Sequence, residues 1–212
     1  MSNTTPPTRS VKIDKDERGG WSSDRPRRDG APPRPADVSV RGRLLKPSDS
    51  LRYSPGSLLI VVSSSPEERD AFTDRLIDNK GSLLSLDKVR GLLSGRVADD
   101  ELEGRAAEVL NAAVLKRLEA NETVVVAAEG LEPEERERYV RMADRFKRPR
   151  HVILLETPRD QVEEDDRPAL NDLRRRLSAG EMGAEGFDTS LRLSGSSTTE
   201  VKRIAFERAP RD

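Results

Sequence analysis

The strongest constraint on the fold is a regular alternation of short apolar runs with amphipathic helical patterns, which begins at Gly56. In the first unit, the apolar run Leu58–Val62 stops at three serines, and a helical pattern begins at Pro66. Parallel strands need long crossover connections, usually helices, so the alternation predicts a parallel sheet with helices on both faces. We therefore predict an α/β fold with a five-stranded parallel sheet in which Leu58–Val62 is a central strand.

The remaining strands and the helices follow from the same patterns. The other expected strands are Ser82–Leu86, Thr123–Ala128, Val152–Leu155 and a last strand around Leu191 and Leu193. The expected helices are Pro66 to about Asn79, Lys88–Leu93, about Asp99 to Ala120, Pro133–Lys147 and a final helix Val201–Arg208. A further helix is expected to start after Thr157-Pro158, to be interrupted near Pro168 and to resume to Leu177.

The first 55 residues differ in composition from the rest of the chain. They contain 12 Lys and Arg against 7 Asp and Glu, whereas the remaining residues are acidic overall. Residues 1–37 are rich in Pro, Arg, Asp, Ser and Gly, and we predict that they lack regular secondary structure. Val38–Leu45 is interpreted either as a short strand or as part of the arm. The sequence thus predicts a disordered basic arm over residues 1–55 and a folded domain over residues 56–212.

The composition excludes several classes of functional site. Because the chain has no Cys, it has no disulfide framework, no cysteine-type zinc site and no thiol nucleophile. Its single histidine, His151, rules out a histidine-cluster metal site, and its place at the start of an apolar strand predicts a packed or edge residue. With no apolar run of about 18 residues and no apolar signal core, we expect a cytoplasmic protein without a membrane span.

The turn after Leu58–Val62 lies where α/β nucleotide-binding proteins place a phosphate loop of the form G-x-x-x-x-G-K-S/T. The same eight-residue frame here runs from Ser63 to Asp70. Ser63 and Glu68 replace the two glycines. Arg69 replaces the lysine, and Asp70 replaces the hydroxyl that holds Mg²⁺. Because two carboxylates would repel a triphosphate, we predict neither a nucleotide cofactor nor a metal at this degenerate loop.

The same residues also match the sequence pattern of a helix N-cap. Ser65, Pro66 and Glu68 would be the N-cap, N1 and N3 residues of a capping box. In that arrangement the helix N-terminus, which otherwise attracts anions, is occupied by its own side chains. We favour this cap, and the alternative is an unusual but working phosphate loop.

The order and spacing of several stretches resemble the P-loop kinases of the polynucleotide-kinase type, within the AAA/zeta-toxin-like P-loop NTPase fold. The resemblance covers about residues 56–208. It rests on Ser82–Arg90, which is similar to a strand ending in S-x-D-x-x-R, on Thr123–Ala128 followed by Pro133–Arg136, on Val152–Pro158, on Asp166–Pro168, and on Gly186–Asp188 followed by Leu191–Leu193. The resemblance implies a five-stranded parallel sheet and transfer of the ATP γ-phosphate to a 5′-hydroxyl of nucleic acid.

The chain departs from this family where the chemistry should lie. The family's acidic residue after the third strand falls on Ala127, and its Asn falls on Gly130. The lid should carry arginines that stabilise the transferring phosphoryl group, but Gln161–Asp165 is acidic and Arg167 is the obvious remaining candidate. Since phosphoryl transfer depends on positioning and charge stabilisation, the loss of these parts together with the phosphate loop should abolish it.

Two residues of the family pattern remain in the sequence. The resemblance implies that Asp87 accepts the proton of the acceptor hydroxyl and that Arg90 contacts the acceptor. A carboxylate at the carboxyl end of a strand also faces the crevice in which such folds bind ligands. The alternative is that Asp87 is the N-cap of Lys88–Leu93 and Arg90 is a surface cation.

The sequence therefore predicts a catalytically inactive kinase-like protein that is a binding or structural module and whose basic arm contacts a partner. One alternative is a divergent ATP-dependent 5′-kinase of nucleic acid, and another is a nucleic-acid-binding adaptor that works without ATP. The expected partner is another protein or a second copy of the chain, with nucleic acid as an alternative ligand of the arm and no membrane. The arm is otherwise interpreted as a solvated tail that folds back on the acidic body.

Overall fold

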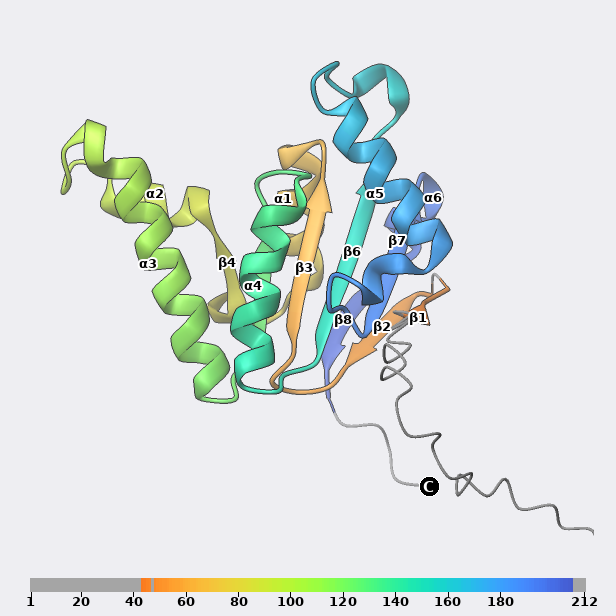
Figure 1. The fold of residues 1–212 in the computed structure, drawn as a ribbon, viewed down its shortest axis with the longest axis horizontal. Coiled ribbons are helices and arrows are strands. Elements are labelled where there is room, and N and C mark those ends of the chain that lie inside the picture. The colour runs from red at the N-terminus through yellow and green to blue at the C-terminus, as the bar shows by residue number, and fades with distance from the viewer. Residues whose placement is uncertain (1–42, 47, 208–212) are drawn as a thin grey trace, which may run out of the picture. The chain divides into compact units, whose positions relative to one another are not determined.

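The computed structural model describes residues 43–46 and 48–207, in which the largest feature is a six-stranded sheet (Figure 1). The strands lie in the order β1, β7, β6, β3, β5, β4, and all neighbours pair in parallel. Their bounds are β1 Arg43–Leu44, β3 Leu58–Ser63, β4 Leu83–Ser85, β5 Val124–Ala127, β6 Arg150–Glu156 and β7 Thr189–Ser194. The predicted five-stranded parallel sheet is confirmed with β3 in its interior, and the short β1 adds one further strand at an edge.

The central strand β3 has the sequence of a strand that is buried on both faces. All its residues are buried, and its Leu, Ile and Val residues form the near-continuous apolar run of a central parallel strand. Leu58 pairs with Val124 of β5 on one side and with Arg150 of β6 on the other. We call the edge at which these strands end, marked by Ser63, Ala127 and Glu156, the carboxyl edge of the sheet.

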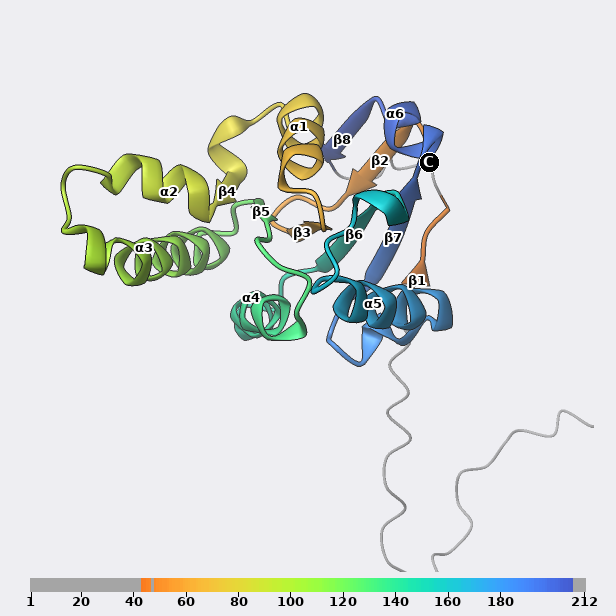
Figure 2. The same cartoon turned by 90° about the horizontal axis from the view of Figure 1, so that it is seen from above.

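One face of the sheet is covered by three helices, α3 (Asp99–Glu119), α4 (Pro133–Arg145) and α5 (Arg167–Ala179). Leu58, Ile60 and Val62 of β3 point into this layer and pack with its apolar residues. Figure 2 shows α4 and α5 on this side of the sheet, and α1 with β2 and β8 on the other. The predicted cover of helices on both faces is therefore confirmed.

The opposite face carries α1 (Pro66–Leu76) and a small parallel sheet made of β2 (Ser50–Tyr53) and β8 (Arg203–Phe206). Leu59 and Val61 of β3 point into this second core, where Phe72 and Leu76 of α1 contact them. Alternate residues of β3 thus bury on opposite faces, as the two-residue period of a strand requires.

The edge strand β4 is followed by α2 (Leu86–Leu93), and α2 and α3 extend together beyond it (Figure 1, Figure 2). Short helical elements complete the described chain: η1 Lys80–Ser82, η2 Arg159–Gln161, η3 Glu181–Gly183 and α6 Ser196–Glu200.

The prediction of a helix over Val201–Arg208 is wrong, because Arg203–Phe206 form the strand β8. β8 pairs with β2, and Glu207 N continues the pairing by donating to Tyr53 O. β2 itself lies within the segment assigned to the disordered arm, so regular structure reaches back into the last residues of that segment. Leu51 and Tyr53 of β2 are buried in the second core, so their side chains hold the small sheet against it.

Pro168 lies at the start of a helix and does not interrupt one. Pro168 was predicted to interrupt a helix, but it lies in the first turn of α5, where a missing N–H costs nothing. The chain after Thr157-Pro158 forms only the short η2 turn before α5 begins.

The predictions for residues 1–37 and for most of Val38–Leu45 concern residues outside the described ranges, and they stay predictions. Among the described residues, no helix is both long enough and apolar enough to cross a lipid bilayer.

Candidate functional site

The connection between β3 and α1 is a helix cap. α1 begins at Pro66, and the Ser65 hydroxyl accepts a hydrogen bond from the Glu68 N–H at 3.3 Å. The predicted cap at Ser65 is therefore confirmed. The prediction of a reciprocal bond from Ser65 N–H to the Glu68 side chain is wrong. Ser65 N–H donates to Ser63 Oγ (3.1 Å), and the Glu68 carboxylate accepts from Thr157 Oγ1 instead.

This early helix start removes the loop that a phosphate would need. Five of the eight residues of the Ser63–Asp70 frame lie in α1, so only Ser64 and Ser65 connect the strand with the helix. Pro66 has no N–H, and the Arg69 N–H donates to Ser65 O. Three N–H groups of this segment, those of Ser65, Glu68 and Arg69, are therefore already bonded within it and are not available to a phosphate.

Arg69, which is predicted to stand in place of a phosphate-binding lysine, has its side chain buried in the protein. It is only 1% exposed, and its guanidinium donates to the Ala128 carbonyl and, at 2.9 Å, to the Asp70 carboxylate. The Asp87 carboxylate lies 3.7 Å from its Nη2. A buried charge requires such partners, because its desolvation would otherwise be very costly.

Asp87 and Arg90, which were predicted to lie at the acceptor side, are brought together by the first turns of α2. Arg90 donates to Asp87 at 2.8 Å, and it also contacts Glu103 of α3 and Glu129, which follows β5. Hydrogen bonding to Glu103 first of all, and also to Glu129 and Asp87, raises the pKa of Arg90, and the pKa of Glu103 is lowered by the same contact. The interpretation of Asp87 as the N-cap of α2 is wrong, because Ser85 Oγ accepts from Lys88 N in that role.

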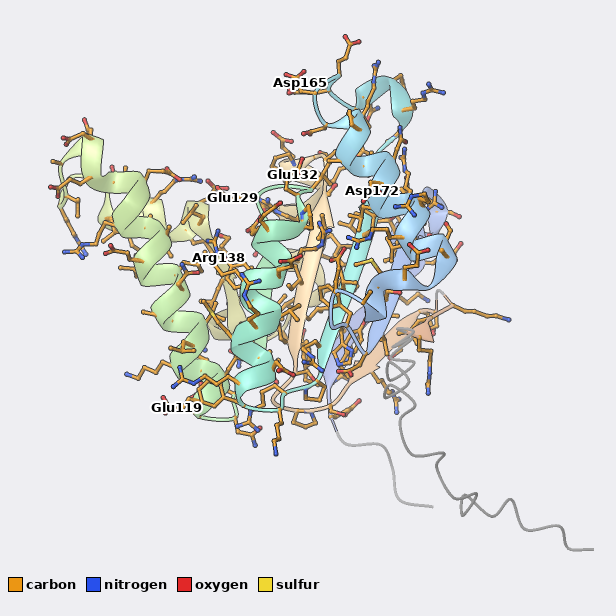
Figure 3. The ribbon with its side chains drawn as sticks, viewed as in Figure 1. Glu119, Glu129, Glu132, Arg138, Asp165 and Asp172 are labelled. Atoms are coloured by element: carbon orange, nitrogen blue, oxygen red, sulfur yellow. The ribbon has the colours of Figure 1, made fainter. Side chains whose placement is uncertain are left out.

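These contacts form one chain of charges along the carboxyl edge, which we call the edge network. Its members are Asp70, Arg69, Asp87, Arg90, Glu103 and Glu129. Four carboxylates therefore surround two guanidinium groups, which leaves an excess of negative charge. In Figure 3, Glu129 and Glu132 lie beside this edge, and Asp165 marks the acidic loop that precedes α5. The side chain of Arg167, the candidate lid arginine, is exposed at the start of α5.

Other anion-binding groups of the same edge are also occupied by carboxylates of the protein. The backbone N–H groups of Glu129 and Gly130 both donate to the Glu135 carboxylate at 3.1–3.2 Å. The Glu156 carboxylate, at the end of β6, is held by Arg174 and Arg192. Sequence reasoning missed these contacts, because the partners come from different elements and no local pattern joins them.

His151 lies away from this edge and is a packed residue, as predicted. Its ring nitrogens contact Thr189 Oγ1 at 2.7 Å and Ser57 Oγ at 3.3 Å, and its ring stacks near that of Tyr53. Burial lowers the pKa of His151 to about 4, so the ring is neutral near pH 7. Within residues 43–46 and 48–207, no three His, Cys, Asp or Glu side chains are grouped so that they could hold a metal ion.

Comparisons with known proteins agree with this architecture. A family model described as "AAA domain" matches residues 71–168. A solved structure from the characterisation of the PezAT chromosomal toxin-antitoxin system of the human pathogen Streptococcus pneumoniae superposes with a TM-score of 0.50. The two are 12% identical, and the match covers 74% of this chain and 71% of that chain. No curated protein matches the chain significantly.

The fold is similar to that of the matched AAA domain and of this solved structure. Strand β3 and helix α1 are joined by a two-residue turn, and the interpretation of this segment as a degenerate phosphate loop stays a prediction. The narrower assignment to the polynucleotide-kinase type stays a prediction.

Proposed function

We propose that this domain is a kinase-like binding module that does not transfer phosphoryl groups. The observation that carries the proposal is the burial of Arg69 at the position of the phosphate-binding lysine. Its guanidinium already bonds to the Ala128 carbonyl and the Asp70 carboxylate, so it is not presented to a ligand. A working loop needs this cation and a ring of free amides directed at the β- and γ-phosphates.

The charge of the edge network supports the same conclusion. A triphosphate that approached the edge network would meet its four carboxylates and its two guanidinium groups, which are both already paired. Two like charges about 4 Å apart repel by about 1 kcal/mol in water, and by more where water is excluded.

The expected partner is a protein with a basic surface or a second copy of the chain, and the site of action is the cytoplasm. An edge with excess carboxylates favours cationic groups, while the basic residues 1–55 are suited to an acidic surface. Nucleic acid, if it binds, would contact the arm rather than the carboxyl edge.

A phosphotransfer assay tests the proposal directly. The full chain is incubated with Mg²⁺, γ-labelled ATP and a 5′-hydroxyl oligonucleotide, next to the Asp87→Asn variant as the matched control. We expect no labelled oligonucleotide from either protein. A labelled 5′ end that the wild type forms and Asp87→Asn does not would overturn the proposal and establish the divergent kinase.

The adaptor alternative is separated by a binding experiment without ATP. Fluorescence anisotropy of a labelled oligonucleotide is measured with the wild type and with a variant in which Arg25, Arg27 and Arg28 are replaced by Ser. Binding that falls with salt and is lost in the variant would assign the arm to nucleic acid and favour the adaptor. Equal, negligible binding by both proteins favours a protein partner.

A further inference from the structure

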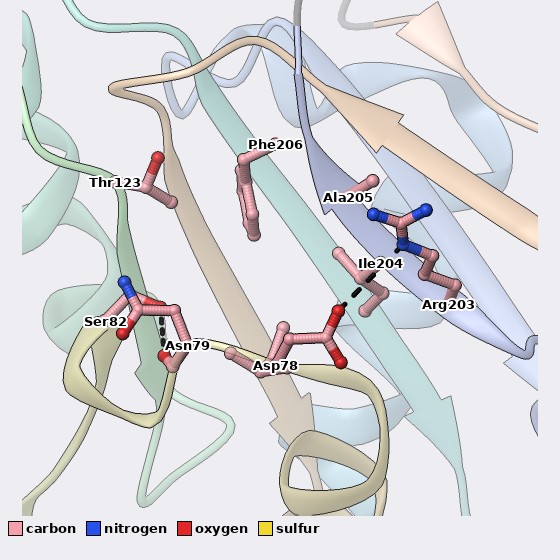
Figure 4. A pocket seen from close by; sticks show the side chains of 9 residues that line it. Asp78, Asn79, Ser82, Thr123, Arg203, Ile204, Ala205 and Phe206 are labelled. Atoms are coloured by element: carbon pink, nitrogen blue, oxygen red, sulfur yellow. Dashed lines mark hydrogen bonds and ion pairs between the residues drawn. The ribbon is translucent and has the colours of Figure 1, made fainter.

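A pocket of about 240 Å³ lies at the end of the sheet opposite the carboxyl edge (Figure 4). It is formed by the chain after α1, the turn η1, the residue before β5, and β8. None of the residues of the edge network lines it. The pocket therefore belongs to a different part of the domain from the degenerate phosphate loop.

The apolar side of the pocket is built around an aromatic ring. Phe206 of β8 lines it together with Ile204 and Ile77, and Figure 4 shows the Phe206 side chain between Thr123 and Ile204. The Phe206 ring centroid lies 5.8 Å from that of the buried Tyr53, which supports it from the side of the core. A supported aromatic face is a surface on which a flat ring can stack.

The polar side retains hydrogen-bonding capacity after its internal bonds are counted. The Asn79 Oδ1 atom accepts from Gly81 N at 3.1 Å, which leaves the amide hydrogens to donate. Thr123 Oγ1 accepts from Gly56 N at 3.0 Å, so its hydroxyl hydrogen can be donated into the pocket. Ser82 Oγ donates to Asn79 O and keeps its lone pairs as acceptors. The pocket thus offers both donors and an acceptor next to an aromatic face.

The charges at the pocket compensate each other. The Asp78 carboxylate and the Arg203 guanidinium lie 4.0 Å apart, and their side chains are 81% and 59% exposed. Such an exposed pair gives little net attraction for a strongly anionic ligand. The pocket is therefore better matched to a neutral ligand than to a nucleotide triphosphate.

We propose that this pocket binds a neutral heteroaromatic ring of nucleobase size, with nucleosides as the ligand class. A nucleobase has a flat π-face for Phe206 and an edge with both donors and acceptors for Asn79, Thr123 and Ser82. The volume lies below the range of about 300–1,000 Å³ that is usual for drug-sized ligands, so a single ring system with a sugar at the mouth is the size it accommodates. The site is independent of the proposed function at the carboxyl edge.

Saturation-transfer NMR with adenosine and uridine as probes tests the proposal on the full chain. The base protons should receive more saturation than the ribose protons, because the ring enters the pocket. Ribose alone should give no signal, and affinities in the millimolar range are expected for ligands this small.

Two pocket variants and one control make the test specific. Asn79→Asp keeps the oxygen that accepts from Gly81 N but loses the donors, and Phe206→Leu keeps an apolar side chain without the aromatic face. Each should weaken adenosine binding about tenfold, as loss of one hydrogen bond or of base stacking implies. Phe146→Leu, a half-buried phenylalanine packed on the other core, should leave binding unchanged.

Absence of any base signal with the wild type would overturn the proposal. So would equal binding by the wild type and Asn79→Asp, a variant that preserves the cap of η1 and so tests the site without disturbing the fold. A loss of binding in Phe146→Leu as large as in Phe206→Leu would also overturn it, since the effect would then follow general stability.

Discussion

Replacement of Arg69 by alanine should destabilise the domain far more than the loss of an exposed arginine. The side chain is 1% exposed, and it joins α1 to the residue that follows β5 through the Ala128 carbonyl. Truncation removes a long buried stem and leaves that buried carbonyl without its donor. The Asp70 and Asp87 carboxylates lose their shared cation at the same time.

The magnitude follows from which partners stay buried. An unsatisfied buried carbonyl costs about 1–3 kcal/mol. Breaking a fully buried ion pair costs about 3–5 kcal/mol, but the Asp70 and Asp87 side chains are 45% and 55% exposed and can be hydrated once the guanidinium is gone. We therefore expect Arg69→Ala to lower the free energy of unfolding by about 3 kcal/mol. Arg69→Lys keeps the charge but loses the planar fork, and should cost about 1–2 kcal/mol.

Urea unfolding followed by far-UV circular dichroism measures these differences. The matched control is Arg138→Ala, an exposed arginine on α4 (Figure 3), which should stay within about 0.5 kcal/mol of the wild type. A loss for Arg69→Ala no larger than for Arg138→Ala would refute the account of a buried, bonded cation. Tight ATP binding by Arg69→Lys would refute it as well, because the two-residue turn should not form a phosphate loop whichever cation is present.

Three further predictions concern the cap, the histidine and a constrained turn. Ser65→Ala should lower the free energy of unfolding, measured with urea, by about 1 kcal/mol. Glu68→Gln should change it little, because the Glu68 side chain does not bond back to Ser65 N. Equal losses of stability in the two variants would contradict this. The folded pKa of His151 is about 4 against an ordinary 6.5, so the stability present above about pH 6.5 should fall by roughly 3 kcal/mol as the pH drops towards 4. His151→Gln should remove this part of the pH dependence, and an unchanged slope would count against it. Gly56 has φ +74°, and a Cβ there would lie 2.2 Å from Asn121 Oδ1, so Gly56→Ala should cost more than about 1 kcal/mol, visible as a lower Tm.

The sheet could be predicted because its signals are local. β3 and β5 are short runs of apolar, mostly β-branched residues, and each is followed by a proline-containing helix start at Pro66 or Pro133. These patterns fix the element type within a short window, and the alternation then fixes the parallel arrangement. The small sheet of β2 and β8 escaped prediction because it joins segments from opposite ends of the described chain, and neither segment alternates clearly enough to indicate a strand.

The candidate site was predictable only in part. The cap at Ser65 is visible in the sequence and is confirmed, whereas the replacement of phosphate-loop residues stays a prediction. The direction of the Arg69 side chain is not, because an arginine in the first turn of a helix is usually a surface residue and here its burial depends on the Ala128 carbonyl. The same holds for Glu135, whose carboxylate reaches back to the amides of the preceding loop.

Isothermal titration of the full chain with Mg-ATP tests the central claim most directly. The titration is run in the presence of saturating adenosine, so that a nucleoside pocket makes no contribution. Because Arg69 is bonded internally and the edge network carries excess negative charge, we predict no saturable heat up to millimolar Mg-ATP. A saturable isotherm with a micromolar Kd that requires Mg²⁺ and survives adenosine would contradict the account, and it would mean that the Ser63–Asp70 segment rearranges into a working phosphate site.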